Sequence, residues 1–351
     1  MTMLSTPLYG SALFACLLLV SPFVLTRASA APPRLENEAS APTENWTLTG
    51  PLTPPVDRIS DEMPLSDQKN AANWTKFEPL WDEFSGAALR SEQWWDHNPT
   101  WYGRAPSRFL GEGQNVHVKD GNLQLVMRRD DTLPRERFHG PDEAFHSYSS
   151  ASVVSKALVR YGYFEVRSQA MNSGGSSSFW FASQMRDRKT GKRYRSEIDV
   201  FELGGKAIGH ENAYHMNAHI FETPADGRRH WNEGGTWTAP FQFADDFHVF
   251  GLLWDAEQLV YYVDGVPVRR MKNTHWHAPL RLIFDSETMG DWLGMPEDKD
   301  LPSTFRIDYV RAWKNSHTDS DWHEAFTTLK DPDVPTNITR YVRSMDEHET
   351  P

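Results

Sequence analysis

Between about residue 75 and residue 315, hydrophobic and polar positions alternate along short runs that end at turn residues. In "YGYFEVRSQA", the apolar residues Phe164 and Val166 lie on either side of a glutamate, and "FRIDYVRAW" repeats this alternation. A period of two residues places one face of a strand against a core and leaves the other for solvent. The pattern therefore predicts a succession of β-strands over this region.

Two of the predicted strand pairs are joined by the dipeptide Asp-Gly, at Asp120-Gly121 and Asp264-Gly265. Asp-Gly between alternating runs favours a two-residue hairpin turn, because both turn positions require a positive φ. The sequence between these hairpins shows no long amphipathic pattern and no repeat of fixed period. We therefore expect an all-β fold, one antiparallel β-sandwich of roughly 240 residues, a size typical of large single-domain sandwiches.

The two ends of the chain lack this alternation. Residues 1–30 contain an apolar run and end in Ala-Ser-Ala, which predicts a signal peptide. An uncleaved membrane anchor is the alternative, although the run is shorter than the roughly 20 residues that a spanning helix needs. Residues 31–65 are rich in Pro, Ser and Thr and predict a disordered spacer. The sandwich is expected over residues 66–315, followed by a polar tail, residues 316–351, with a short helix near Trp322 to Leu329.

Composition narrows the classes of function. The single cysteine, Cys16, lies within the expected signal peptide, so the mature chain is expected to form no disulfide. Cleavage also removes Arg27 and leaves 35 basic against 48 acidic residues, a formal charge of −13. This charge argues against nucleic acids and anionic membranes as partners. The 14 Trp residues favour a flat ligand such as a carbohydrate, with core packing as the alternative.

The stretch "SEIDVFE", residues 196–202, places three carboxylates in six positions of a predicted strand. Side chains at i and i+2 share a face, so Glu197 and Asp199 point the same way and Glu202 points to the opposite face. One extra residue near Val200-Phe201, a β-bulge, brings Glu202 to the face of the other two. A row of like charges is costly, and glycoside hydrolysis requires two such carboxyl groups, one as nucleophile and one as acid.

The motif E-x-D-x-x-E, here "EIDVFE", resembles the catalytic motif of glycoside hydrolase family 16. Further stretches resemble that family in the same order, namely "LWDEFSG", "SKALVRYGYFEVRSQA", "SSSFWFAS", "FHVFGLLWDAEQLVYYVDG" and "FRIDYVRAW". The resemblance implies a concanavalin-like jelly-roll β-sandwich with a concave substrate cleft. It also implies Glu197 as the nucleophile, Asp199 as its helper and Glu202 as the acid/base. A Ca²⁺ site formed by the three acids and a solvated edge strand are the alternatives.

Several polar and aromatic stretches resemble the cleft of β-agarases and porphyranases within that family, namely "YHMNAHIF", "RLIFDSETMGDWLGMP", "WYGRAPSRF" and "SSSFWFAS". Sugar rings stack on aromatic faces while their hydroxyls hydrogen-bond to polar groups. The substrate-binding residues expected from these stretches are Trp101, Arg104, Trp180, His215, Asn217, His219, Glu287 and Trp292. Core packing is the alternative for the tryptophans and histidines. Zinc binding by the two histidines has no evident third ligand.

A basic segment precedes the catalytic strand. It reads "RDRKTGKRYR" and contains Arg186, Arg188, Lys189, Lys192, Arg193 and Arg195. A solvated hairpin tip is one interpretation. A site for a sulfate ester is the other, because guanidinium groups bind anionic oxygens in a bidentate manner. Arg195 lies two residues from Glu197 and is the member expected to reach the cleft.

The sequence and the resemblance together predict a secreted (extracellular or periplasmic), endo-acting retaining glycoside hydrolase that cleaves β-1,4 galactosidic bonds of an agarose-like red-algal galactan. A sulfated galactan such as porphyran or κ-carrageenan, a β-1,3-glucan such as laminarin, and a non-catalytic sugar-binding module are the alternatives. The expected partner is the polysaccharide, with no nucleic acid and no membrane after signal cleavage, and the chain is expected to be a monomer. No cofactor is expected for catalysis. The resemblance allows a structural Ca²⁺ whose ligands the sequence does not assign.

Overall fold

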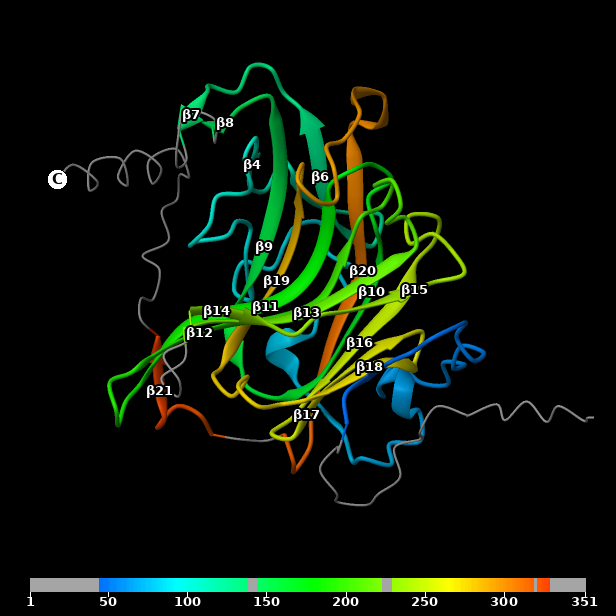
Figure 1. Ribbon diagram of the computed structural model, residues 1–351, viewed down its shortest axis with the longest axis vertical. Helices are drawn as coiled ribbons and strands as arrows, with labels where there is room; N and C mark the ends of the chain where they lie inside the picture. The colour runs from blue at the N-terminus through cyan, green and yellow to red at the C-terminus, as the bar shows by residue number, and fades with distance from the viewer. Residues whose placement is uncertain (1–43, 138–143, 223–228, 319–320, 329–351) are drawn as a thin grey trace, which may run out of the picture.

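The computed structural model describes residues 44–137, 144–222, 229–318 and 321–328, and most of its regular structure is β-strand (Figure 1). Three short 3-10 helices, η1 (Leu65–Asp67), η2 (Glu78–Leu80) and η3 (Asp298–Asp300), lie between strands. The strands are β1 (Trp46–Thr47), β2 (Thr75–Lys76), β3 (Trp94–Trp95), β4 (Ser107–Phe109), β5 (Val116–Lys119), β6 (Asn122–Arg129), β7 (Glu136–Arg137), β8 (Ala144–Phe145), β9 (Tyr148–Val159), β10 (Gly162–Gln169), β11 (Ser176–Asp187), β12 (Arg193–Leu203), β13 (Ala213–Glu222), β14 (Arg229–Asn232), β15 (Gly235–Thr238), β16 (His248–Trp254), β17 (Gln258–Val263), β18 (Val266–Lys272), β19 (Leu280–Glu287), β20 (Ser303–Lys314) and β21 (Phe326–Thr328).

Hydrogen bonds arrange most strands in two antiparallel sheets. The outer sheet has the order β1-β18-β17-β16-β10-β20-β6-β5, with β2 beside β20. The cleft sheet has the order β3-β9-β19-β11-β12-β13, with β14 and β15 beside β13 and β21 beside β11. Strand β9 also pairs with β6 and, in parallel, with β4, which joins the two sheets. This arrangement confirms the predicted all-β jelly-roll sandwich.

Alternating apolar side chains of the two sheets meet in one core. Phe164 of β10 contacts Phe181 of β11, with ring centroids 4.9 Å apart, and Phe201 of β12 contacts Phe250 of β16 at 4.5 Å. All four rings are buried. Because the inward positions of β11 and β12 are occupied in this way, the alternate residues of both strands face the other side of the cleft sheet.

The two Asp-Gly turns form as predicted. Asp120 and Gly121 connect β5 to β6 with φ values of 56° and 72°, and Asp264 and Gly265 connect β17 to β18 with φ values of 50° and 79°. Positive φ at both central positions matches the right-handed twist of the flanking strands. These hairpins fix the register of four strands of the outer sheet.

Residues 44–65 are ordered against the sandwich, which corrects the predicted disordered spacer for this part of it. Strand β1 pairs with the edge strand β18, and Arg58 forms an ion pair with the buried Glu165 of β10. A proline-rich segment without periodicity can still bind a sheet edge through its backbone and its charged side chains. Residues 1–43, which include the expected signal peptide, lie outside the described residues. Among the residues that are described, no helix is long and apolar enough to cross a membrane.

The short helix expected near Trp322 to Leu329 is wrong, because residues 326–328 form β21 and pair with β11. Pairing with an available strand edge and burial of Phe326 decide the local structure here, not the propensity of the segment. Residues 329–351 lie outside the described part of the chain.

Candidate active site

Strand β12 carries the three predicted carboxylates, and its register contains the predicted bulge. Adjacent residues of β11, Phe179 and Trp180, pair with Phe201 and Asp199, so Val200 is the extra residue. The pairing of β12 with β13 shifts over the same interval. The bulge is therefore confirmed, and the three acids of β12 line one cleft.

The cleft has a volume of about 470 Å³ and lies on the side of β11 and β12 that faces away from the core. Five of the predicted substrate-binding residues line it together with the three carboxylates. They are Trp101, Arg104, Trp180, Arg195 and Glu287. Polar groups placed among aromatic side chains suit a ligand that has both apolar faces and hydroxyls.

The wall formed by β19 and the loop before β4 contains two further acids. Trp180 Nε1 donates a 2.7 Å hydrogen bond to Asp285 Oδ2, and Arg104 donates through Nε to Glu287 Oε2 at 2.9 Å. Trp101 packs edge-on against Trp180 with ring centroids 6.1 Å apart. Sequence reasoning missed Asp285, although its position two residues before Glu287 on a strand places both side chains on the same face.

Burial and mutual repulsion shift the carboxyl groups of the cleft towards their neutral forms. Burial, followed by the charges of Asp199 and Glu202, holds the pKa of Glu197 well above its usual range. Burial, followed by the charges of Asp199, Glu287 and Asp285, does the same to the pKa of Glu202. The pKa of Asp199 is also raised by burial, against the opposing effect of His219. A carboxylic acid that stays protonated near neutral pH can donate a proton to a leaving group.

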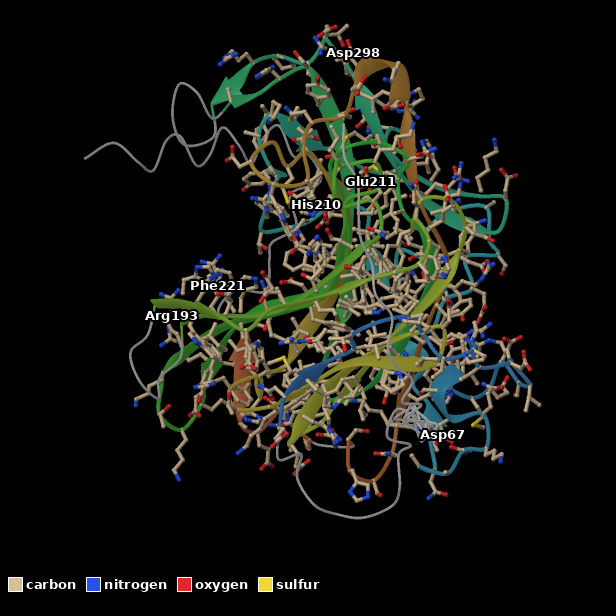
Figure 2. All side chains as sticks on the ribbon, turned by 45° about the vertical axis from the view of Figure 1, so that its right-hand side comes forward. Asp67, Arg193, His210, Glu211, Phe221 and Asp298 are labelled. Carbon is tan, nitrogen blue, oxygen red and sulfur yellow. The ribbon has the colours of Figure 1, made fainter. Side chains whose placement is uncertain are left out.

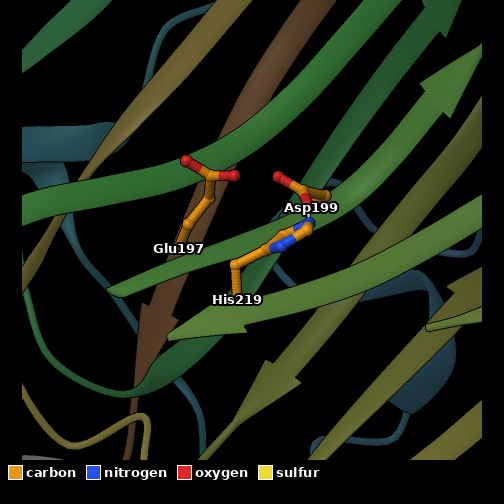
Figure 3. Close-up of side chains that lie close together, drawn as sticks. All are labelled: Glu197, Asp199 and His219. Atoms are coloured by element: carbon orange, nitrogen blue, oxygen red, sulfur yellow. Dashed lines mark ion pairs between the residues drawn. The ribbon is translucent and has the colours of Figure 1, made fainter. Parts of the chain in front are cut away.

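His219 of β13 reaches the middle carboxylate, since its Nε2 lies 3.1 Å from Asp199 Oδ2 (Figure 3). One donor atom from each of Glu197, Asp199 and His219 falls within 4.8 Å of the others, a spacing that a metal ion also requires. The ion pair between His219 and Asp199 explains the spacing of those two groups without a cation. His219 also contacts His230 Nε2 through Nδ1 at 2.9 Å.

The remaining predicted contacts lie beyond the residues that line the cleft. His215 pairs with Glu202 across β12 and β13, and its Nε2 is 2.9 Å from His210 Nδ1. Burial, with a contribution from His210, lowers the pKa of His215 to about 4. Trp292 is 42% exposed, and its ring centroid lies 4.8 Å from that of His215. Asn217 pairs with Asp199 in the register of the two strands.

The basic segment forms the end of the β11–β12 hairpin, which projects from the body of the molecule. Figure 2 labels Arg193 on this hairpin and Phe221 on the neighbouring strand β13. Arg195 lines the cleft, and its guanidinium lies 4.6 Å from the centre of the Phe221 ring. Among the described residues no carboxylate forms an ion pair with Arg195. Its charge instead acts on Glu197, whose pKa it lowers against the effect of burial.

A family model described as "Beta-porphyranase A-D, GH16 domain" matches residues 74–315. β-Porphyranase D of Zobellia galactanivorans is 28% identical over 295 residues, which cover 78% of this chain and 65% of that protein. β-Porphyranase E of the same organism is 30% identical over 258 residues, which cover 70% of this chain and 88% of that protein. The chain thus spans slightly less than two thirds of the first of these relatives.

Solved structures show the same fold. Porphyranase B from Zobellia galactanivorans aligns with a TM-score of 0.57 at 23% identity, over 69% of this chain and 92% of that structure. A β-porphyranase from the human gut bacterium Bacteroides plebeius aligns with a TM-score of 0.56 at 25% identity, over 73% and 93%.

Proposed function

The chain belongs to glycoside hydrolase family 16, and from this premise we propose that it is an endo-acting, retaining hydrolase of a red-algal galactan. The observation that carries the proposal is the bulge at Val200, which brings Glu197, Asp199 and Glu202 into one cleft. In the proposed assignment, Glu197 is the nucleophile, Asp199 its helper and Glu202 the acid/base. A sugar-binding module does not require a row of carboxylates whose pKa values are raised by burial and by one another.

The proposed reaction is a double displacement. Glu202, protonated, gives its proton to the glycosidic oxygen while the carboxylate of Glu197 attacks the anomeric carbon. Glu202 then takes a proton from water as that water breaks the glycosyl ester and restores Glu197. The charges around Glu202 favour this division, because a proton held on Glu202 removes one of the repulsions that oppose ionisation of Glu197.

A sulfated galactan is the substrate that we favour over neutral agarose. The family model and both relatives carry the name β-porphyranase, and Arg195 offers a guanidinium that has no carboxylate partner in the described part of the cleft. A sulfate ester would supply that partner through charge-assisted hydrogen bonds. Agarose-like specificity remains the second candidate, since the cleft also offers Trp101 and Trp180 for uncharged sugar faces. Secretion is part of the proposal, because a polymer of this kind is degraded outside the cell.

The test is release of reducing ends from porphyran, agarose, κ-carrageenan and laminarin by the chain without residues 1–30, with Glu197→Gln as the blank. We expect release from porphyran first, and retention of the anomeric configuration in NMR spectra of the initial products. Release from laminarin alone would contradict a galactan substrate. No release from any of the four would contradict the proposed activity.

Arg195→Met sharpens the test, because it keeps the apolar stem of the side chain and removes the charge. We expect a loss of roughly tenfold or more in kcat/KM on the sulfated galactan, the size of one or two charge-assisted hydrogen bonds, and little change on agarose. Lys189→Met is the matched control, since Lys189 belongs to the same hairpin, is exposed and does not line the cleft. Equal losses on both polymers would show that Arg195 does not read sulfate.

A further inference from the structure

Strand β21 lies outside the part of the chain that the family model matches, which ends at residue 315, and yet it belongs to the cleft sheet. Its residues pair with Met185, Arg186 and Asp187 of β11. In Figure 1 it lies beside the projecting end of the β11–β12 hairpin. The segment after the catalytic domain thus returns to the strand that borders the carboxylate row.

β21 pairs with a part of β11 that no other described strand covers on that edge. On this edge, β19 pairs with β11 only as far as Ala182, while on the opposite edge β12 pairs with β11 as far as Arg186. β21 pairs with the edge that β19 leaves, so the outer half of the hairpin has three strands in place of two. An isolated two-stranded hairpin is marginally stable in water, and a third strand with an apolar face stabilises it.

Two side chains hold β21 against the hairpin, namely Phe326 of β21 and Arg188 of the hairpin. Phe326 is buried against Met185 and packs edge-on against Tyr194 of β12, with ring centroids 5.4 Å apart. Arg188 donates from Nε to the carbonyl oxygens of His323 and Phe326, both at 3.0 Å. The Arg188 backbone N–H donates to the Ala325 carbonyl at 2.9 Å. Arg188, one member of the basic segment, therefore holds β21 in place and is not available to bind substrate.

The cleft extends onto this reinforced hairpin. Thr328 of β21 lines it together with Gln184 and Arg195. Gln184 and Arg195 pair across β11 and β12, two positions along each strand from the pair of Ala182 and Glu197, so they continue the face of the nucleophile. These three residues offer an amide, a hydroxyl and a guanidinium to one ligand.

We propose that β21 completes a distal subsite that binds a further sugar residue of the galactan chain, through Thr328, Gln184 and Arg195. The proposal rests on the proposed function for the nature of the ligand. The subsite binds the polymer away from the bond that is cleaved, so it lowers KM for long chains and leaves the chemical step unchanged. The C-terminal segment is then a specificity element that sets the minimum efficient length of the substrate.

The test compares Phe326→Ala and Arg188→Ala with the wild-type chain on a ladder of galactan oligosaccharides of increasing length and on the polymer. We expect KM for the polymer and the longer oligosaccharides to rise about tenfold, the loss of one or two hydrogen bonds. We expect kcat to stay constant, and the shortest cleaved oligosaccharide to show wild-type kinetics. Lys189→Ala is the control, because it removes a positive charge next to Arg188 at an exposed position for which the described residues show no hydrogen bond or ion pair with β21.

Limited trypsin digestion gives a second measurement that needs no substrate. The hairpin tip contains Lys192 and Arg193, which both variants and the Lys189→Ala control retain. We expect both undocking variants to be cleaved after these two residues several-fold faster than the wild-type chain and the control. Faster cleavage with an unchanged dependence on substrate length would overturn the subsite. If the wild-type chain cleaves no galactan, the proposed function fails, and unchanged trypsin cleavage of the variants would then overturn the role of β21 as well.

Discussion

In the described part of the chain, two groups of carboxylates gather around buried acids, one group at each sheet, and they differ in how their charge is balanced. The cleft cluster consists of Glu197, Asp199, Glu202, Asp285 and Glu287. Within the described part of the chain, Glu287 is the member that has an ion pair with an arginine, while Asp199 lies beside an imidazole. The pKa of every member is raised, with burial as the largest cause.

The second group, the strap cluster, consists of Glu165, Tyr309, Arg58, Arg311, Asp61 and Glu83. Glu165 is fully buried, yet its carboxylate accepts from Arg58, from Tyr309 OH at 2.9 Å and from the Leu65 backbone N–H at 2.6 Å. Arg311 donates to Glu83 through two nitrogens, at 2.8 and 2.9 Å, and to Asp61.

The difference separates carboxylates that hold the fold together from carboxylates to which we assign the catalytic roles. In the strap cluster each acid has a cation, and the cluster fastens residues 58–65 to the outer sheet. In the cleft cluster the acids face one another, which destabilises the folded state and leaves protons available for transfer. Burial alone therefore does not identify a site, because Glu165 is as buried as Asp199.

Glu197→Gln gives the largest effect expected from this comparison. Removal of the proposed nucleophile should lower kcat on the proposed galactan substrate by roughly 10⁴-fold or more, measured as reducing ends released at saturating substrate. Because the substitution also removes one of the repelling charges, we expect the free energy of unfolding at pH 7 to stay constant or rise. Glu92→Gln, at an exposed position, is the control. A marked loss of stability in Glu197→Gln would mean that the cleft cluster is balanced after all.

Glu165→Gln should behave in the opposite way. The amide cannot neutralise Arg58, so this partly buried cation keeps only the more distant carboxylate of Asp61, at 3.8 Å. We expect a loss of about 3 kcal/mol in the free energy of unfolding, the lower end of the range for breaking a buried ion pair. The measurement is denaturant unfolding at constant pH, with turnover per folded molecule expected to remain at the wild-type level. Glu83→Gln serves as the control, because its side chain is 40% exposed and its ion pair is worth less. If Glu165→Gln were as stable as Glu83→Gln, the buried carboxylate of Glu165 would not be what holds the strap cluster together.

The sequence predicted the cleft cluster better than the strap cluster for a physical reason. Strand parity is a local rule, so the pattern around Val200 was enough to predict a bulge, and the structure contains it. The same rule, applied to "FDSE", would have added Asp285. The partners of Glu165 lie far apart in the chain, with Arg58 separated from it by 107 positions. No local pattern reveals such contacts, and the composition around Arg58 therefore predicts a disordered spacer.

Loops limited the prediction at the edges of the site in the same way. Strand parity placed His215 and His219 on one face of β13, but the positions of Trp292 and His210 depend on loops whose paths the sequence does not determine. The structure gathers His210, His215 and Trp292 into a group next to the cleft. Thr328 was missed because its role follows from the pairing of β21 with a strand more than 100 residues earlier.

A change of pH alone, without any substitution, should also distinguish the two clusters through its effect on the free energy of unfolding. A carboxyl group whose pKa is higher in the folded state than in the unfolded state binds more protons when folded, over the pH window between the two values. The cleft cluster therefore predicts that the free energy of unfolding falls as the pH rises from about 4.5, the usual glutamate range, through the raised pKa values of Glu197 and Glu202. Glu197→Gln should flatten this slope, and Glu83→Gln in the strap cluster should not.

Activity should follow the same protons. kcat/KM is expected to decline as the pH rises through the raised pKa of Glu202, because Glu202, the proposed acid, then loses the proton that it would give to the leaving oxygen. Denaturant unfolding at a series of pH values and a pH–rate profile of the wild-type chain measure the two effects on one protein. If the stability of Glu197→Gln fell with pH as steeply as that of the wild-type chain, the surplus charge would not lie in the cleft. The contrast with Glu165 would then have to rest on geometry alone.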